Sequence, residues 1–85
     1  MPHSTQPRIT MTVHADDNVT TLMDDRRDEP CTQQGLVLQL PLPFGHKVAL
    51  RAIAAGGPVI KYGVVIGTAT AAIATGEHVH VHNCR

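Results

Sequence analysis

Apolar and polar residues alternate over short stretches of this chain, and glycine or proline separates most of the stretches. Residues 9–14 read Ile-Thr-Met-Thr-Val-His, which is typical of a strand with one buried face. The same reasoning predicts strands over residues 36–40, 46–54, 59–63, 64–67 and 77–83. Only residues 17–24 suggest a helix, because Asp17 and Asn18 can cap a first turn ahead of apolar residues at helical spacing. We therefore expect a small, mostly β domain with one or two short helices.

Length and composition limit what this domain can bury. Residues 1–8 are polar and hold two prolines, so we expect a disordered tail before a single domain over residues 9–85. The whole chain of 85 residues has one Phe, one Tyr and no Trp, and its core must be built from aliphatic side chains. A core this small gives modest stability, which favours a partner subunit or a homo-oligomer.

Charge and cysteine content exclude several classes of function. Seven basic residues balance seven acidic ones, which argues against a nucleic-acid partner or a charged membrane surface. No apolar run approaches the roughly 20 residues that a membrane span requires. Cys31 and Cys84 could pair but form no disulfide framework, so we expect a reduced, cytoplasmic protein.

Three of the six histidines lie at alternate positions near the end of the chain, with valine between them. On a strand, His78, His80 and His82 would share one face, and Val79 and Val81 the other. Neighbours on that face lie about 6.5–7 Å apart at Cα, so at most two of the three could bind one metal ion, whereas the outer pair, about 13 Å apart at Cα, could not easily do so. The third imidazole would then serve as a hydrogen-bond donor or a general acid or base. The alternative is a solvated polar face without chemistry.

Two lysines extend the set of candidate residues. His46 and Lys47 follow a glycine turn, where a surface role is the simpler interpretation. Lys61 lies beside Tyr62 within an apolar run, so its ammonium either reaches solvent or binds a substrate carboxylate. No nucleophile elbow, phosphate loop or dinucleotide fingerprint is present.

These motifs together resemble the N-terminal SAF domain of the altronate/galactarate dehydratase family. The residues that carry the resemblance are 14–19, 46–50, 53, 56, 59–63, 66–67, 69, 73 and 76–83. The resemblance implies a β-clip fold and a lyase that dehydrates a sugar acid to a 2-keto-3-deoxy acid. It also implies a divalent metal, with Fe(2+) expected and Mn2+ or Zn2+ as alternatives.

The matching positions do not by themselves divide ligands from substrate-binding residues. Our assignment gives catalysis to His46, Lys47, His80 and His82, substrate binding to Lys61, Tyr62 and Asn83, and metal binding to His78 and His80.

The resemblance also implies a partner. The full dehydratases continue for several hundred residues, whereas this chain ends at Arg85, as in lyases such as sulfolactate sulfo-lyase that are split into a small and a large subunit. We therefore expect a small subunit that is inactive alone and works with a large catalytic lyase subunit on a sugar acid or another hydroxy acid. The alternatives are a subunit of a carbon–sulfur lyase, a non-catalytic sugar-acid-binding module, and an assembly role with the histidines buried at an interface.

Overall fold

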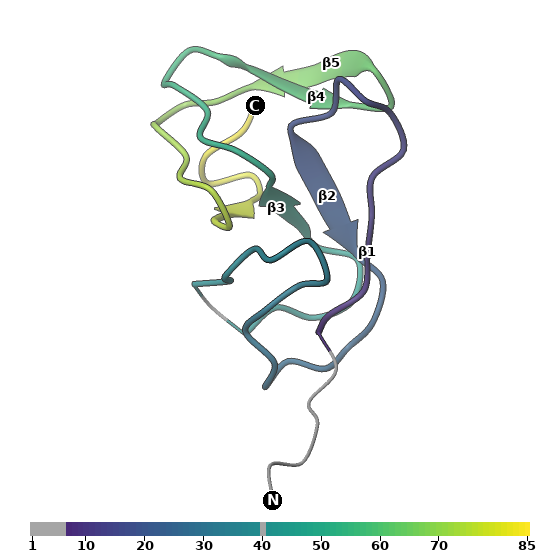
Figure 1. Cartoon of the computed structure of the whole chain (residues 1–85). Helices are drawn as coiled ribbons and strands as arrows, with labels where there is room; N and C mark the ends of the chain where they lie inside the picture. The colour runs from purple at the N-terminus through teal and green to yellow at the C-terminus, as the bar shows by residue number, and fades with distance from the viewer. Residues whose placement is uncertain (1–6, 40) are drawn as a thin grey trace, which may run out of the picture.

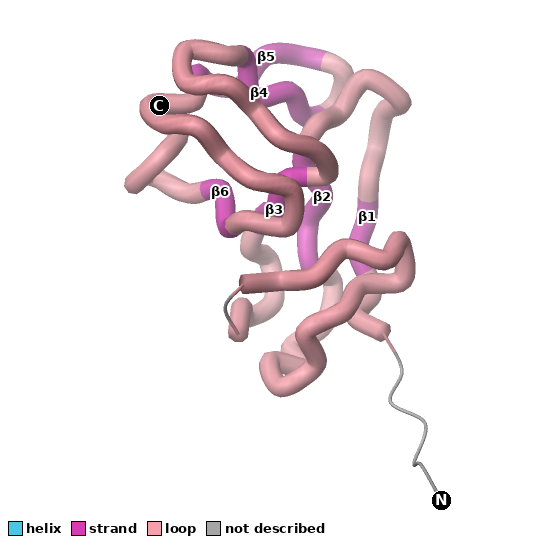
Figure 2. Tube along the Cα trace, turned by 60° about the vertical axis from the view of Figure 1, so that its left-hand side comes forward, coloured by secondary structure: helices cyan, strands magenta, loops and turns pink. Residues whose placement is uncertain are grey.

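The computed structural model describes residues 7–39 and 41–85, and it folds them into short strands joined by long turns (Figure 1). The strands are β1 (Thr10–Met11), β2 (Val19–Leu22), β3 (Lys47–Ala49), β4 (Pro58–Lys61), β5 (Val64–Thr68) and β6 (His78–Val79). Figure 2 shows the strands as brief segments of a chain that is otherwise loop. The mostly β fold is confirmed. The described residues contain no helix, and so none that could cross a membrane.

Four of the strands form one antiparallel sheet, and the other two form a separate hairpin. The sheet has the order β1-β2-β3-β6, and β4 pairs with β5. In the sheet, Val19 lies opposite Ala49, and Val48 lies opposite His78. Figure 1 shows the hairpin above the end at which β2 begins. The sheet therefore places the start of β3 beside the C-terminal histidines.

The predicted helix over residues 17–24 is wrong, because this segment contains β2, which pairs with both β1 and β3. Instead of capping a helix, the Asn18 side chain connects β2 to the hairpin. Its amide nitrogen donates to the Pro58 carbonyl at 2.8 Å, and its oxygen accepts the Ile60 N–H at 2.7 Å. Two neighbouring strands and this non-local connection outweigh the local helical spacing.

Three predicted strands are largely turn: residues 36–40, 46–54 and 77–83. The first keeps one bridge, between Val37 and Cys31, and its residue 40 lies outside the described residues. The second keeps β3 and a bridge between Ile53 and Ile73, and the third keeps only β6. The predicted strands in the hairpin agree closely with β4 and β5.

Two apolar clusters make up the core. One contains Val19, Ala49, Ile53, Val59, Ala69, Ile73 and Val79, and the other Leu22, Leu36, Leu38, Leu42 and Val48. β3 contributes to both, because successive side chains of a strand point to opposite faces. The same alternation buries Val79 of β6 in the first cluster and turns His78 to the face of Val48.

Arg8 corrects the predicted start of the domain. The expected tail covers residues 1–8, of which 1–6 lie outside the described residues. Arg8 itself is fully buried, and its Nε donates to a carboxylate oxygen of Asp24 at 2.8 Å. Its guanidinium also donates to the Leu42 carbonyl, and its backbone N–H donates to the Cys31 carbonyl at 2.7 Å. Arg8 is therefore part of the fold.

Candidate functional site: a cluster of four histidines

The rings of three other histidines surround that of His78. The centroid of its ring is 4.9 Å from that of His46, 5.3 Å from that of His80 and 5.5 Å from that of His82. The rings of His46 and His80 are stacked at 5.6 Å. His46 Nδ1 and His78 Nε2 are 2.8 Å apart, so one proton is shared in a hydrogen bond between them. The structure thus brings His46 into the group that the spacing along the chain predicted.

Pairing of β3 with β6 explains the position of His46. Val48 lies directly opposite His78. His46 comes two residues before Val48 and projects from the same face, where it meets His78 diagonally across the two strands. Nothing in the local sequence indicates this contact, because 32 positions separate the two histidines along the chain.

A turn, rather than a strand, positions the last histidines. β6 ends at Val79, and the N–H of Asn83 donates to the His80 carbonyl at 3.0 Å. The turn brings the ring of His82 back to that of His78, so the extended backbone that was expected between these two residues is wrong. It also leaves Val81 79% exposed, whereas Val79 is buried.

The Asn83 side chain holds this turn. It is buried, its amide oxygen accepts the His80 N–H at 3.0 Å, and its amide nitrogen donates to the His78 carbonyl at 2.8 Å. The structure therefore gives Asn83 a positioning role beneath the histidines. Its predicted role in binding substrate stays a prediction.

Burial and neighbouring positive charge keep His78 neutral. Burial, together with the electrostatic influence of His46, His80, His82 and Lys47, lowers the pKa of His78 to about 4. A neutral imidazole has a lone pair free to accept a proton or to bind a metal ion. His78 is therefore available as a metal ligand at neutral pH, whereas its low pKa makes it a weaker base than an ordinary histidine.

The histidine nitrogens are suitable metal ligands, but too few ligands of the described residues are arranged around one point to hold an ion. Imidazole nitrogens bind zinc, iron and nickel. Among residues 7–39 and 41–85, however, no three His, Cys, Asp or Glu side chains are arranged to hold one ion. Further ligands would have to come from water, a substrate or another chain.

Lys47 lies beside His80 on another side of the cluster. Both line a hollow of about 280 Å³, together with the apolar side chains of Ile66, Val79 and Val81. The predicted catalytic residues His46, Lys47, His80 and His82 therefore all lie at one end of the sheet. Their catalytic roles stay predictions.

Lys61 and Tyr62 are not part of this group. They line a different hollow, of about 170 Å³, next to the turn between β4 and β5. The length of β5, about 13 Å at the usual rise per residue, separates this turn from the end of β5 that pairs with the C-terminus. Figure 1 shows the two ends of the hairpin on opposite sides of the molecule.

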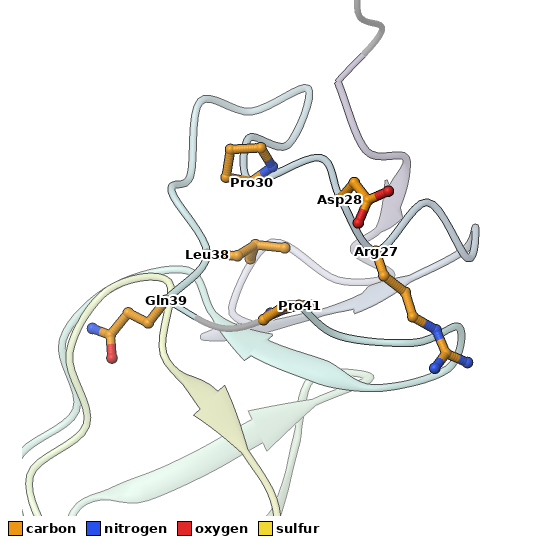
Figure 3. A pocket seen from close by; sticks show the side chains of 6 residues that line it. All are labelled: Arg27, Asp28, Pro30, Leu38, Gln39 and Pro41. Carbon is orange, nitrogen blue, oxygen red and sulfur yellow. The ribbon is translucent and has the colours of Figure 1, made fainter.

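A further hollow, of about 280 Å³, has no chemistry comparable with the histidine cluster (Figure 3). Pro30, Leu38 and Pro41 give it an apolar floor, and the Gln39 side chain points away from it. The Arg27 guanidinium turns outward and pairs with Asp25 at 3.0 Å.

Asp17 has a structural role that its place in a predicted helix did not suggest. It is buried, and its carboxylate accepts the Gly63 N–H at 2.8 Å and the His14 N–H at 3.1 Å. Burial raises the pKa of this carboxyl, but backbone hydrogen bonds from Gly63, Tyr62 and His14 outweigh it and lower the pKa overall. Asp17 thus anchors the hairpin turn.

The sequence of this chain is similar to those of known proteins. The altronate/galactarate dehydratase SAF domain matches residues 8–85. Altronate dehydratase of Escherichia coli is 45% identical over 76 residues, which are 86% of this chain and 15% of that protein. The galactarate dehydratase of the same organism is 45% identical over 67 residues, 76% of this chain and 13% of that protein.

A shorter relative is the alpha subunit of (2R)-sulfolactate sulfo-lyase from Paracoccus pantotrophus. It is 48% identical over 50 residues, which are 59% of this chain and 75% of that protein. This chain thus spans only a small part of the dehydratases but most of the length of a lyase subunit. With a match over nearly all of its residues, the chain belongs to the altronate/galactarate dehydratase SAF domain family.

Proposed function

We propose that this chain is the small subunit of a metal-dependent hydro-lyase that dehydrates a sugar acid to a 2-keto-3-deoxy acid. The observation that carries the proposal is the cluster of four imidazoles, in which three surround the neutral His78. Such a cluster can hold a metal ion and move protons. Relatives named altronate and galactarate dehydratase supply the class of substrate.

The dehydration needs a base for the proton next to the carboxylate and an acid for the departing hydroxyl. The proton moves to the base, the hydroxyl leaves as water, and the resulting enol becomes the 2-keto acid. In this proposal His82 exchanges a proton with the substrate, and His46, which is hydrogen-bonded to His78, is the second proton-carrying group of the cluster. Lys47 places a positive charge beside His80, where it attracts a carboxylate.

His78 and His80 are the residues we propose to hold a divalent metal, Fe(2+) in the first place. A bound metal of this kind would act as a Lewis acid on the carboxylate or the hydroxyl of the substrate. Burial suits His78 to the role, because an imidazole must be neutral to bind a metal.

A large catalytic subunit would complete the site. Two features support this partner: the ligand set among the described residues is incomplete, and the dehydratase relatives are far longer than this chain. A relative whose name includes "subunit alpha" belongs to a lyase that has more than one chain. We also propose a cytoplasmic, reducing setting, because Cys31 and Cys84 are both free thiols.

The test combines this chain with the large lyase subunit from the adjacent reading frame. We expect release of 2-keto-3-deoxy acid from altronate or galactarate only when both chains and Fe(2+) are present. His80→Ala should abolish activity and leave folding and subunit binding intact, whereas Val37→Asn, a change of an exposed side chain that is not part of the histidine cluster, should leave activity unchanged. Ordinary turnover by this chain alone would refute the two-subunit proposal. Metal-independent binding of sugar acid, without lyase activity in the pair, would favour a binding module.

A carbon–sulfur lyase subunit is the second candidate. The alpha subunit of sulfolactate sulfo-lyase supports it, since the matched region covers 75% of that protein. Sulfite release from sulfolactate by the same pair of chains, without dehydration of either sugar acid, would favour this function over the first.

A further inference from the structure

The turn between β4 and β5 holds an unusual residue. Tyr62 and Gly63 form its two central positions, with φ of 59° and 74°, between the paired residues Lys61 and Val64. Positive φ at both positions is typical of a type I′ turn, in which Asn-Gly or Asp-Gly is preferred. A bulky aromatic residue in this conformation costs free energy. Tyr62 is also 56% exposed, so burial in the core does not offset that cost.

The Tyr62 ring instead lies under a positive charge. Lys61 Nζ is 4.6 Å from the ring centroid. Within residues 7–39 and 41–85, no carboxylate forms an ion pair with this ammonium. Lys61 can therefore take an acidic partner from outside the chain without losing one inside it.

Apolar side chains and an unpartnered hydroxyl surround this pair. Met11, Val13 and Met23 line the hollow of about 170 Å³ beside Lys61 and Tyr62, and each of the three is exposed. Thr21 lines the same hollow, and its buried hydroxyl has no hydrogen-bond partner in the described structure.

Apolar exposure continues from the hollow along β5. The register of the hairpin shifts between Val59 and Ile60, and Val64, Val65 and Ile66 are exposed in succession. Tyrosine and methionine, which line this apolar hollow, are enriched in the centres of protein interfaces.

We propose that this surface, made of Met11, Val13, Met23, Lys61, Tyr62 and Val64, is where the large lyase subunit docks. The inference rests on the proposed function. An acidic side chain of the large subunit pairs with Lys61, and an apolar side chain fills the hollow. A polyhydroxy acid does not suit apolar walls, whereas a protein side chain does.

The lengths of the relatives favour this occupant. In the two dehydratases of Escherichia coli the matched region is 15% and 13% of the protein, so most of each chain lies outside it and needs a surface against which to pack. A standard interface is roughly 30 Å across, whereas about 13 Å of β5 separates the turn from the C-terminal end of the hairpin. One bound subunit is therefore wide enough to cover the turn and the full length of β5.

Tyr62→Asn separates binding from folding. Asparagine suits the type I′ turn, so the melting temperature of the isolated chain should rise while its affinity for the large subunit falls at least tenfold. Lys61→Glu should weaken binding to a similar extent with little change in melting temperature, because it reverses the charge of a partly exposed side chain that has no ion pair among the described residues. Val37→Asn, at an exposed apolar position outside this surface, is the matched control and should keep the affinity within twofold. Binding is measured by titration calorimetry with the purified large subunit.

The possible results distinguish a failure of the proposed function from a failure of the docking surface. If the unmodified chain and the large subunit do not associate, the proposed function fails, and this inference fails with it. If they form an active complex that Tyr62→Asn and Lys61→Glu leave as tight as before, the docking surface is wrong and the proposed function stands. If the chain alone forms a dimer that Tyr62→Asn dissociates, the surface binds a second copy, which also overturns the inference.

Discussion

Replacing Asn83 with alanine should both destabilise the fold and disperse the histidine cluster. The change removes two part-buried hydrogen bonds, one from the His80 N–H at 3.0 Å and one to the His78 carbonyl at 2.8 Å. Each lost bond costs about 1 kcal/mol, and each backbone group left unpaired adds a penalty of similar size, so we expect a loss of about 2–4 kcal/mol. A domain of this length has an unfolding free energy of roughly 4–13 kcal/mol, so the variant should still fold.

Without the Asn83 side chain, the turn after β6 should open and the ring of His82 should move away from that of His78. His78 would then be less buried and farther from neighbouring positive charge, so its pKa should rise from about 4 toward the ordinary value of 6.5. Urea unfolding followed by circular dichroism measures the stability. Titration of the imidazole resonances by NMR measures the pKa.

Asn18→Ala is the matched control, because that amide is also buried and also makes two hydrogen bonds to backbone, at 2.8 and 2.7 Å. It should lower stability by a similar amount and leave the pKa of His78 unchanged. If Asn83→Ala kept both the native stability, within about 0.5 kcal/mol, and the low pKa of His78, the turn would not depend on this side chain.

Three further predictions concern the rest of the fold. The pKa of His78 is lower in the folded chain than in the unfolded one, so the unfolded state takes up a proton first as the pH falls. The stability of the metal-free chain should therefore be complete above pH 6.5 and fall as the pH drops toward 4. His78→Gln should flatten this part of a plot of melting temperature against pH. Arg8→Ala should cost about 3 kcal/mol in urea unfolding, because it removes a fully buried guanidinium that bonds to Asp24 and to the Leu42 carbonyl and leaves Asp24 paired with Arg26 alone. A cost under about 1 kcal/mol would show that the pair of Arg8 and Asp24 is dispensable. Gly76→Ala should lower the free energy of unfolding by at least about 2 kcal/mol, because φ is +81° and a Cβ would overlap the Val37 carbonyl oxygen. A melting temperature equal to that of the unmodified chain would contradict this prediction.

Local features of the chain determined much of the fold. Short apolar runs bounded by glycine and proline predicted both strands of the β4–β5 hairpin, because a hairpin with a two-residue turn is set by residues that are close in sequence. Motifs at residues 59–63 and 76–83 were sufficient for the resemblance to the SAF domain, which the family match confirms. The spacing of His78, His80 and His82 correctly indicated a concentration of imidazoles, since the three lie within a few positions of one another.

Contacts between distant segments decided the remainder. Residues 17–24 have helical spacing, yet they contain β2, because β1, β3 and the side-chain bonds of Asn18 satisfy an extended backbone there. Helical periodicity records only which residues are apolar, and it carries no information about which strands are available to pair. Arg8 was assigned to a tail for the same reason: the groups that it bonds lie far along the chain.

The histidine cluster shows both contributions. The sequence by itself placed three imidazoles close together and identified the family in which they occur. Only the tertiary structure added His46, through pairing of β3 with β6, and brought His82 back to His78, through the turn that Asn83 holds. Strand periodicity assumes that an extended backbone continues, whereas buried hydrogen bonds from one side chain are sufficient to end the strand after Val79 and gather the rings around His78.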